Sequence, residues 1–99
     1  MAVLQINVTP LGTEESSISS FVSEACKIAR DKGLKFEVNP MSTVIEGHQS
    51  ELFDVAQKMH EMPFQMGANR VITSITIDER TDKQTDMENM VEAVTQKLD

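Results

Sequence analysis

The sequence predicts an α+β fold in which helices cover one side of a four-stranded antiparallel sheet. Four segments alternate apolar and polar residues with a period of two, which is typical of strands that bury one face. Two segments between them repeat apolar residues every three or four positions, which is typical of helices that bury one stripe. The order of these segments along the chain decides the topology.

The first expected strand begins at Ala2, and Pro10 and Gly12 are expected to end it. Its two faces alternate along the chain: Ala2, Leu4, Ile6 and Val8 on one side, and Val3, Gln5, Asn7 and Thr9 on the other. The first set is apolar and predicts the buried face of the sheet. The second set is mostly polar and predicts the opposite face.

A helix follows the first strand. Thr13 or Ser16 can cap it, and the acidic residues Glu14 and Glu15 suit the positive end of the helix dipole. Gly33 is expected to end this helix. Its apolar stripe consists of Ile18, Phe21, Val22, Ala25 and Ala29.

Residues 34–47 predict two strands that meet at an Asn-Pro corner, Asn39 and Pro40. Before the corner, two sets of residues alternate: Leu34, Phe36 and Val38 with Lys35, Glu37 and Asn39. Beyond the corner, Ser42, Thr43 and Glu46 bring two hydroxyls and a carboxylate close to the amide of Asn39.

The second helix is expected to start near Ser50. Pro63 limits how far it can run undistorted, and Gly67 closes the region. The residues expected to face inward are Leu52, Val55, Ala56 and Met59.

The last expected strand covers residues 70–79, and a final helix follows it. Residues 85–88 have the spacing of a capping box, in which Glu88 reaches back to the amide of Thr85. The apolar stripe of the final helix consists of Met87, Met90, Val91, Val94 and Leu98.

The order of the elements is therefore βαββαβ with one further helix. Because βαβ crossovers are right-handed, this order favours a ferredoxin-like sandwich with an added C-terminal helix and a four-stranded antiparallel sheet. We expect residues 1–99 to form a single domain, since their number is near the usual domain size. The two crossover helices cover one face of the sheet, which leaves the other face open.

The open face is expected to mix uncharged polar residues with apolar ones. Its expected members are Gln5, Asn7, Thr9, Asn39, Met41 and Ser74, together with Val3 and Ile72. Such a surface suits a subunit interface or a ligand, and the stripe of the final helix also needs a partner. We therefore expect the protein to self-associate.

The composition excludes several classes of protein. The net charge of −7 argues against nucleic-acid binding, because a phosphate backbone needs clustered Lys and Arg. Cys26 is the only cysteine, so no internal disulfide can form. The N-terminus lacks the features of a signal peptide, and no apolar run approaches the ~18 residues of a membrane span. We expect an acidic cytoplasmic protein without a membrane partner.

Neither a catalytic site nor a metal site is predicted. His48 and His60 lie on an expected loop and helix, and His60-Glu61 lacks the second histidine of a zinc-protease motif. Cys26 lies beside an apolar stripe and is expected to be a buried, inert thiol. No nucleophile, base and orienting group occur together, so neither catalysis nor a cofactor is expected. The charged residues that bracket the last strand are expected to form weak salt bridges within or between subunits: Arg70, Arg80, Asp82 and Lys83.

The polar side chains near the corner allow two interpretations. Asn offers donors and an acceptor, Ser and Thr offer rotatable hydroxyls, and Glu46 could accept from an amine or balance a cation. Such a set can recognise a small heterocycle. On residue types alone, solvation of a strand edge is the simpler explanation.

Several short motifs together resemble a known family. They are residues 8–13 (VTPLGT), 40–47 (PMSTVIEG), 60–61 (HE), 70–73 (RVIT), 77–80 (IDER) and 82–83 (DK). In this order, over nearly the whole chain, they look like the small thiamine-binding protein family, whose members are similar to the repeats of the YkoF thiamine-binding proteins. The resemblance implies a ferredoxin-like fold and sheet-to-sheet dimers that often pair into tetramers. It also implies binding of thiamine or its hydroxymethylpyrimidine part without turnover, by a carrier, buffer or sensor.

The resemblance also suggests where the ligand binds. Thr43 and Glu46 lie in the most family-like motif and are the first expected contacts. Five further contacts are expected because the residues lie on the open sheet face: Asn7, Thr9, Asn39, Met41 and Ser74. We expect this site at the open sheet face near a subunit interface. Two residues depart from the family pattern: Ser42 stands in place of a glycine, and Pro63 is expected to shorten the second helix.

Two other functions stay open. The chain could be a structural or regulatory homo-oligomer that binds a protein partner and no small molecule. An enzyme of thiamine salvage would need a nucleophile or a metal set, and the sequence offers neither.

Overall fold

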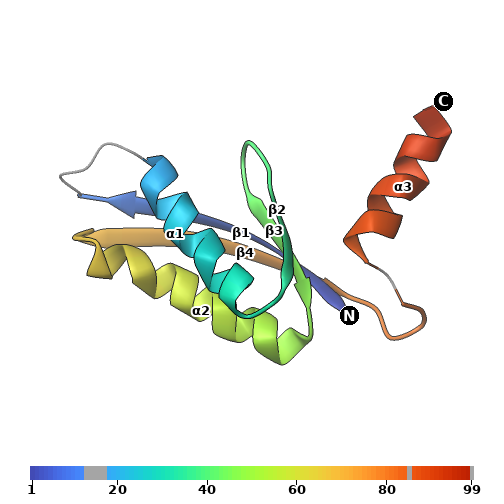
Figure 1. The fold of residues 1–99 in the computed structure, drawn as a ribbon, viewed down its shortest axis with the longest axis horizontal. Coiled ribbons are helices and arrows are strands. Elements are labelled where there is room, and N and C mark those ends of the chain that lie inside the picture. Colours follow the sequence, from blue (N-terminus) through green and yellow to red (C-terminus); the bar gives the residue numbers. More distant parts are fainter. Residues whose placement is uncertain (13–17, 85, 99) are drawn as a thin grey trace.

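The computed structural model describes residues 1–12, 18–84 and 86–98. Seven elements occur in this part of the chain (Figure 1): β1 (Ala2–Leu11), α1 (Ile18–Asp31), β2 (Lys35–Val38), β3 (Thr43–Gly47), α2 (Gln49–Gln65), β4 (Arg70–Glu79) and α3 (Met87–Leu98). The expected features of the first helix start lie outside the described residues: the cap at Thr13 or Ser16, Glu14 and Glu15, and the side chain of Ile18.

The four strands form one antiparallel sheet in the order β2-β3-β1-β4. Both α1 and α2 lie on the same side of this sheet, whereas α3 projects away from it (Figure 1). The predicted α+β, ferredoxin-like arrangement is therefore confirmed. The bounds expected for the last strand, residues 70–79, are also those of β4.

The core lies between the sheet and the two covering helices. The apolar face predicted for the first strand is buried at Ala2, Leu4 and Ile6. The other fully or nearly fully buried members of this core cluster are Ala29, Ile45, Leu52, Val55, Ala56 and Met59. Because burying one large aliphatic side chain contributes roughly 1.5–3 kcal/mol, this cluster supplies the main driving force for the fold.

Strand β1 is longer than expected, because it runs through Pro10 to Leu11. Pairing between β1 and β3 stops where Ile6 faces Thr43, so the second half of β1 pairs with β4 alone. Pro10 therefore lies where β1 has a neighbour on one side only, and a strand tolerates a missing N–H group there. The expectation that Pro10 ends the strand is wrong for this reason.

Helix α1 ends at Asp31, and Gly33 closes its C-terminal turn as expected. Gly33 has a φ of 75° and its N–H donates to the carbonyl of Arg30, while the N–H of Leu34 donates to the carbonyl of Ala29. Such a left-handed residue closes the last turn of a helix, and glycine adopts it without steric cost.

Helix α2 continues past Pro63 and ends two residues later, at Gln65. The proline ring is buried, and its carbonyl accepts the N–H groups of Met66 and Ala68. Pro63 thus lies in the last turn, where losing one helical hydrogen bond disturbs little of the helix. It does not shorten α2 in the way that the sequence suggested.

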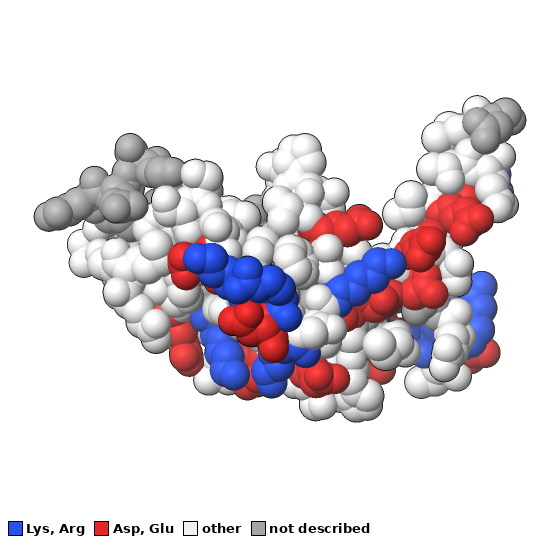
Figure 2. Space-filling model, in the orientation of Figure 1, with Lys and Arg blue, Asp and Glu red and all other residues white. Residues whose placement is uncertain are grey.

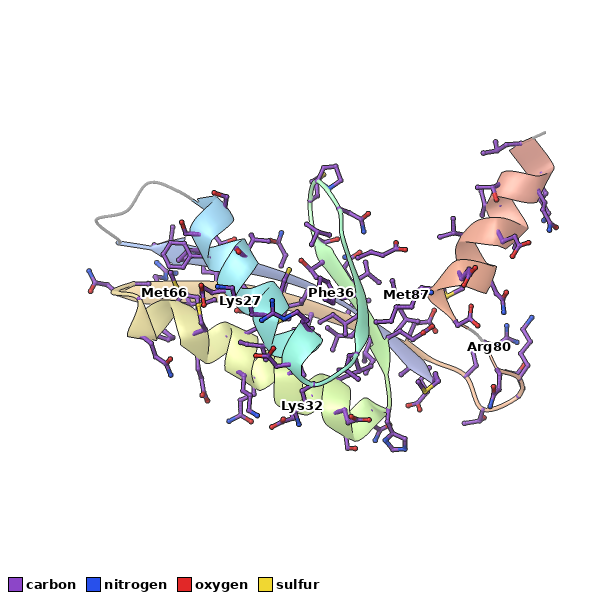
Figure 3. The ribbon with its side chains drawn as sticks, in the orientation of Figure 1. Lys27, Lys32, Phe36, Met66, Arg80 and Met87 are labelled. Atoms are coloured by element: carbon purple, nitrogen blue, oxygen red, sulfur yellow. The ribbon has the colours of Figure 1, made fainter. Side chains whose placement is uncertain are left out.

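Helix α3 begins at Met87, and Asp86 caps it. The Asp86 carboxylate accepts the N–H of Asn89 at 2.7 Å, which places the cap one residue after the expected position. Thr85 itself lies outside the described residues, and Glu88 pairs with Lys35 of β2 at 3.5 Å. Met87 is buried beside the sheet at the base of α3 (Figure 3). The rest of the predicted stripe is exposed: Met90, Val91, Val94 and Leu98.

Candidate functional site

The β2–β3 hairpin turns sharply at Pro40 and Met41. The N–H of Asn39 donates to the carbonyl of Ser42 at 2.8 Å, which closes a two-residue loop. Among the described residues, only glycines have a positive φ, so this loop is not one of the primed turns that match the twist of paired strands. Other turn types make the strands diverge, and the hairpin tip here extends beyond the point where β3 leaves β1 (Figure 1).

A cavity of about 130 Å³ lies under this hairpin tip, where the tip approaches both covering helices. Its lining residues come from β1, α1, the hairpin and α2: Ile6, Asn7, Val8, Phe21, Val22, Ala25, Val38, Asn39, Pro40, Met41, Ser42, Thr43, Met62 and Pro63. The cavity therefore lies at the end of the sheet where β1 continues without β3 beside it.

No charged side chain occurs among the described residues that line this cavity. In Figure 2 the charged side chains form a band across the outer surface of the helices, and the hairpin tip carries none. The lining combines an apolar wall that includes Phe21 and Met62 with the polar residues Asn39, Ser42 and Thr43. Such a cavity can hold a neutral ring and offer it hydrogen bonds along one side.

Four of the seven expected site residues line the cavity, three of them from the hairpin. Asn7, Asn39, Met41 and Thr43 line the cavity, whereas Thr9, Glu46 and Ser74 do not. Asn39 and Met41 lie at the hairpin tip, outside the bounds of β2 and β3, and line the cavity from there.

Asn7 contributes to the cavity from the middle of β1. It follows Ile6, which is buried on the helix side, so strand alternation turns the Asn7 side chain to the open face. There Asn7 is paired with Ser74, and Thr9 is paired with Ile72. Asn7, Thr9 and Ser74 thus form a separate polar group on the opposite side of the sheet from Thr43.

Glu46 has a different partner. Its Oε1 accepts the N–H of Met87 at 2.8 Å, so the carboxylate binds the first turn of α3. An acidic group at a helix N-terminus satisfies an amide that has no partner within the helix and interacts favourably with the dipole. Glu46 therefore holds α3 at the sheet instead of lining the cavity.

Sequence reasoning missed the contribution of the helices to this cavity. Phe21 and Val22 belong to the predicted apolar stripe of α1, and their helical spacing assigns them to the core without showing a nearby space. Met62 and Pro63 lie at the end of α2, and no pattern in the sequence shows that this end reaches the hairpin. The proline inside an otherwise regular helix is the single signal that could have marked this end.

Thr43 also lies next to the single cysteine. Burial raises the pKa of the Cys26 thiol, and a hydrogen bond with the Thr43 side chain partly offsets that rise. The thiol is half-buried rather than fully buried. A raised pKa leaves little thiolate at neutral pH, which agrees with the inert role expected for Cys26.

The two histidines make local contacts. His60 Nδ1 lies 2.7 Å from the hydroxyl of Thr73, and His48 Nδ1 lies 3.1 Å from the hydroxyl of Ser50. Across residues 1–12, 18–84 and 86–98, no group of three or more His, Cys, Asp or Glu side chains could hold a metal ion.

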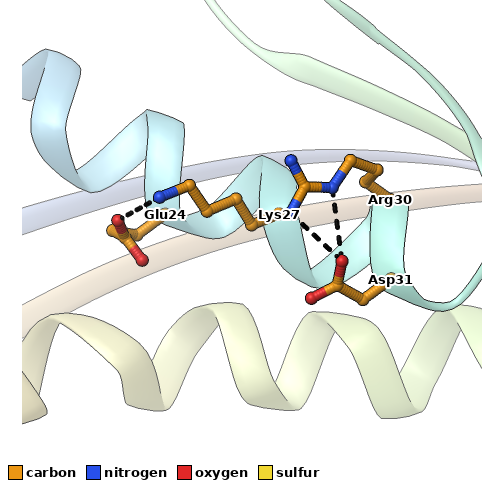
Figure 4. A network of polar contacts seen from close by, with 4 residues as sticks. All are labelled: Glu24, Lys27, Arg30 and Asp31. Atoms are coloured by element: carbon orange, nitrogen blue, oxygen red, sulfur yellow. Dashed lines mark hydrogen bonds and ion pairs between the residues drawn. The ribbon is translucent and has the colours of Figure 1, made fainter.

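The charged side chains outside the cavity form exposed pairs. Lys27 lies 2.8 Å from Glu24, and Arg30 lies 3.2 Å from Asp31, on the outer surface of α1 (Figure 4). Arg80 pairs with Asp82 as expected for a local salt bridge after β4. Exposed pairs of this kind contribute at most about 1 kcal/mol each, so they bear on solubility more than on a site.

In the part of the chain that the structure describes, no helix is long and apolar enough to cross a membrane. The cytoplasmic location expected from the sequence stays a prediction.

Comparison with known proteins places the chain in a family. The model of the family described as "Thiamine-binding protein" matches residues 4–95. The chain is 42% identical to the UPF0045 protein YqgV of Bacillus subtilis, with 99% of this chain and 98% of YqgV covered. It is 32% identical to a UPF0045 protein of Methanothermobacter thermautotrophicus, over 99% of this chain and all of that protein.

Solved structures show the same fold. The structure of the hypothetical protein MJ1052 from Methanocaldococcus jannaschii matches with a TM-score of 0.86 and 31% identity, over 95% of each chain. A protein from Thermotoga maritima described as a putative thiamine biosynthesis/salvage protein matches with a TM-score of 0.75 over 93% of this chain and 97% of that one. At 24% identity, that second likeness bears on the fold alone. The resemblance first suggested by the short sequence motifs is confirmed over nearly the whole chain, which belongs to the thiamine-binding protein family.

Proposed function

We propose that this protein binds thiamine or its hydroxymethylpyrimidine part without turning it over, and that the pyrimidine ring occupies the cavity under the β2–β3 hairpin. The observation that carries this proposal is the cavity itself, which is small, uncharged and lined by hydroxyl and amide groups on one side. Family membership supports the choice of ligand. The protein would act as a carrier, buffer or sensor.

The size of the cavity favours a single ring. Its volume of about 130 Å³ is close to that of an engineered cavity of about 150 Å³ that binds benzene, and well below the roughly 300 Å³ at which pockets for drug-sized ligands begin. One six-membered ring fills such a space. The second ring of thiamine would then extend out of the cavity into solvent or towards a neighbouring subunit.

The polarity of the cavity favours the same part of the ligand. An aminopyrimidine is neutral and presents an amine with ring nitrogens, which the Asn39, Ser42 and Thr43 side chains can match. A thiazolium cation or a phosphate would lack a charged partner there, and burying an unpaired charge is costly. The net charge of −7 attracts a cationic ligand to the protein but does not select a position for it.

Calorimetry with hydroxymethylpyrimidine, thiamine and the thiamine phosphates tests this proposal. The Thr43→Val variant keeps the side-chain shape and removes one hydroxyl from the cavity, so we expect the Kd for hydroxymethylpyrimidine to rise about 5- to 100-fold. Ser74→Ala removes a hydroxyl from the open face and should bind like the wild type. If none of these ligands gave heat at millimolar concentration, the proposal would be wrong.

We also propose that the open sheet face and the α3 stripe mediate self-association into a dimer or tetramer. The exposed apolar residues on these surfaces support it: Ile72, Met90, Val91, Val94 and Leu98. They also favour a second candidate function, a structural or regulatory oligomer that binds a protein partner and no small molecule. Under that alternative, a Thr43→Val variant, which leaves both surfaces intact, would lose no cellular phenotype that depends on the protein.

A further inference from the structure

A second depression in the protein surface lies between α1 and β2, and we call it the α1–β2 groove. Its volume is about 400 Å³, so it is larger than the cavity under the hairpin, and it is open to solvent. Figure 3 labels Lys27 on α1 and Phe36 on β2, the two elements that form its walls. The polar side of the groove belongs to α1 alone, which contributes Ser19, Ser23, Cys26, Lys27 and Arg30.

These residues of α1 form one continuous polar strip. Each lies three or four positions from another member of the set, which is the spacing of neighbours on a helix surface. Hydroxyl, ammonium and guanidinium groups all donate hydrogen bonds. The strip therefore offers a row of donors to a ligand with several acceptor oxygens.

The charge in the groove is positive. Among the described residues that line it, Lys27 and Arg30 are the charged ones, and no carboxylate occurs. Their acidic partners, Glu24 and Asp31, line a different groove, which lies between α1 and α2. The protein as a whole has a net charge of −7, so this groove is a local exception that suits an anion.

Both cations keep donors for a ligand. Nε and Nη2 of Arg30 donate to one oxygen of Asp31, each at 3.2 Å, and Nη1 takes no part in these two bonds (Figure 4). Nζ of Lys27 donates to Glu24 at 2.8 Å, and an ammonium group has three N–H donors. Each ion pair can therefore persist while its cation binds a further oxygen atom.

The α1–β2 groove adjoins the cavity under the hairpin. Val22 and Val38 line both of them. The Cys26 thiol lines the groove and is hydrogen-bonded to the side chain of Thr43, which lines the cavity. A ligand that fills the cavity next to Thr43 thus lies close to the groove.

We propose that the α1–β2 groove is a phosphate subsite, and that the preferred ligand is a phosphate ester of hydroxymethylpyrimidine rather than thiamine. This inference rests on the proposed function, in which the pyrimidine ring occupies the cavity. The amine and the hydroxymethyl group are neighbours on that ring. A ring whose amine faces Thr43 therefore has its hydroxymethyl group on the side of Cys26 and the groove.

The group carried by the hydroxymethyl carbon decides between the ligands. In the phosphate ester this group is an anion with several acceptor oxygens, which Lys27, Arg30 and the serine hydroxyls can bind. In thiamine the same carbon carries the thiazolium cation, which the two cations would repel. Because Lys27 and Arg30 are exposed, salt screens both effects, and the selectivity is largest at low ionic strength.

Calorimetry of the full chain at low salt tests this selectivity. We expect the Kd for hydroxymethylpyrimidine phosphate to be about tenfold lower than the Kd for hydroxymethylpyrimidine, and lower than that for thiamine. If hydroxymethylpyrimidine binds and its phosphate ester binds no tighter, the phosphate subsite is wrong while the proposed function stands. If neither pyrimidine binds at millimolar concentration, both are wrong.

A pair of double variants tests the position of the subsite. Lys27→Met with Arg30→Met removes both cations from the groove and should abolish the preference for the phosphate ester. The Kd for hydroxymethylpyrimidine should stay unchanged, which also shows that the variant is folded. Lys58→Met with Lys83→Met makes the same change in net charge outside the groove and should keep the preference. Equal loss in both double variants would assign the preference to overall charge and overturn the subsite.

Cys26 reports whether the ligand reaches the groove. At saturating concentrations, the phosphate ester should slow the alkylation of Cys26 by iodoacetamide more than hydroxymethylpyrimidine does, because only the ester extends into the groove that the thiol lines. Equal protection by the two ligands would contradict this placement of the phosphate.

Discussion

Thr43 occupies a position that joins three parts of the molecule. It begins β3, faces Ile6 of β1 across the ladder and contacts Cys26 of α1 through its side chain. A residue at the start of a paired strand has a fixed backbone, so its hydroxyl is held in place at the cavity wall. Because the hydroxyl is already fixed, little side-chain entropy is lost when a ligand binds to it. A single hydroxyl can therefore contribute measurably to the affinity for the ligand.

The Cys26 thiol gives a direct measure of the environment beside the cavity. Because burial raises its pKa, less thiolate is present at pH 8 than in a free cysteine. We expect the rate of alkylation by iodoacetamide to be lower than that of a cysteine-containing peptide, with its pH midpoint shifted upward. A midpoint at or below that of the peptide would contradict the half-buried placement of the thiol.

Among the elements, α3 depends most on a single contact. Its N-terminal turn is held by the Glu46 carboxylate and by burial of Met87, while the rest of its apolar stripe is exposed in one chain. Helices with so few tertiary contacts open at low free energy. The position of α3 on the protein thus depends on a residue of β3.

Replacing that carboxylate should loosen α3. We expect Glu46→Ala to leave the Met87 amide without an acceptor and to increase hydrogen exchange of α3 amides several-fold at low protein concentration, with β1 and β3 amides unchanged. Glu46→Gln keeps a neutral acceptor, so its rate of α3 amide exchange should lie between those of the wild type and Glu46→Ala. Unchanged exchange in Glu46→Ala would show that the contact does not hold the helix.

The end of α1 and the start of α2 are joined by a charged group. Asp54 lies 2.7 Å from Lys32 and 3.1 Å from Lys58, and the pKa of its carboxyl is lowered, first by the hydrogen bond from Lys32 and then by that from Lys58. A carboxyl with a lowered pKa in the folded state stabilises the protein above its unfolded pKa of about 4. That stabilisation is lost as the pH falls through the folded value.

The corresponding variant is Asp54→Asn. At neutral pH its unfolding midpoint in urea should be lower than that of the wild type, and the two midpoints should converge below about pH 4. Lys32→Met removes the first partner and should reproduce most of the difference. A gap between wild type and Asp54→Asn that stays constant down to pH 2 would refute this linkage.

At the scale of the whole molecule, periodicity predicted the sheet and its helices well because each element has one strongly apolar face. The bounds of β4 follow from ten alternating residues, and the end of α1 from one glycine. The expectation that Pro10 ends β1 is wrong because β1 tolerates a proline where β3 no longer pairs with it. The sequence of β1 alone does not show where that pairing stops.

The site was harder to predict for a similar reason. Alternation already separates Thr43 from Glu46, since residues three apart on a strand face opposite sides. The cavity itself depends on how far the hairpin extends over α1 and on where α2 ends, and neither distance is encoded in a local pattern. The sequence therefore pointed to the hairpin that lines this cavity, but it placed the expected site on the opposite face of the sheet.

A crystal of this protein grown with hydroxymethylpyrimidine tests the central claim most directly. We predict difference density for one flat ring under the β2–β3 hairpin, between Thr43 and Phe21, with its amine towards the polar side of the cavity. Density between Asn7 and Ser74 on the open face, with the cavity empty at saturating ligand, would contradict the account.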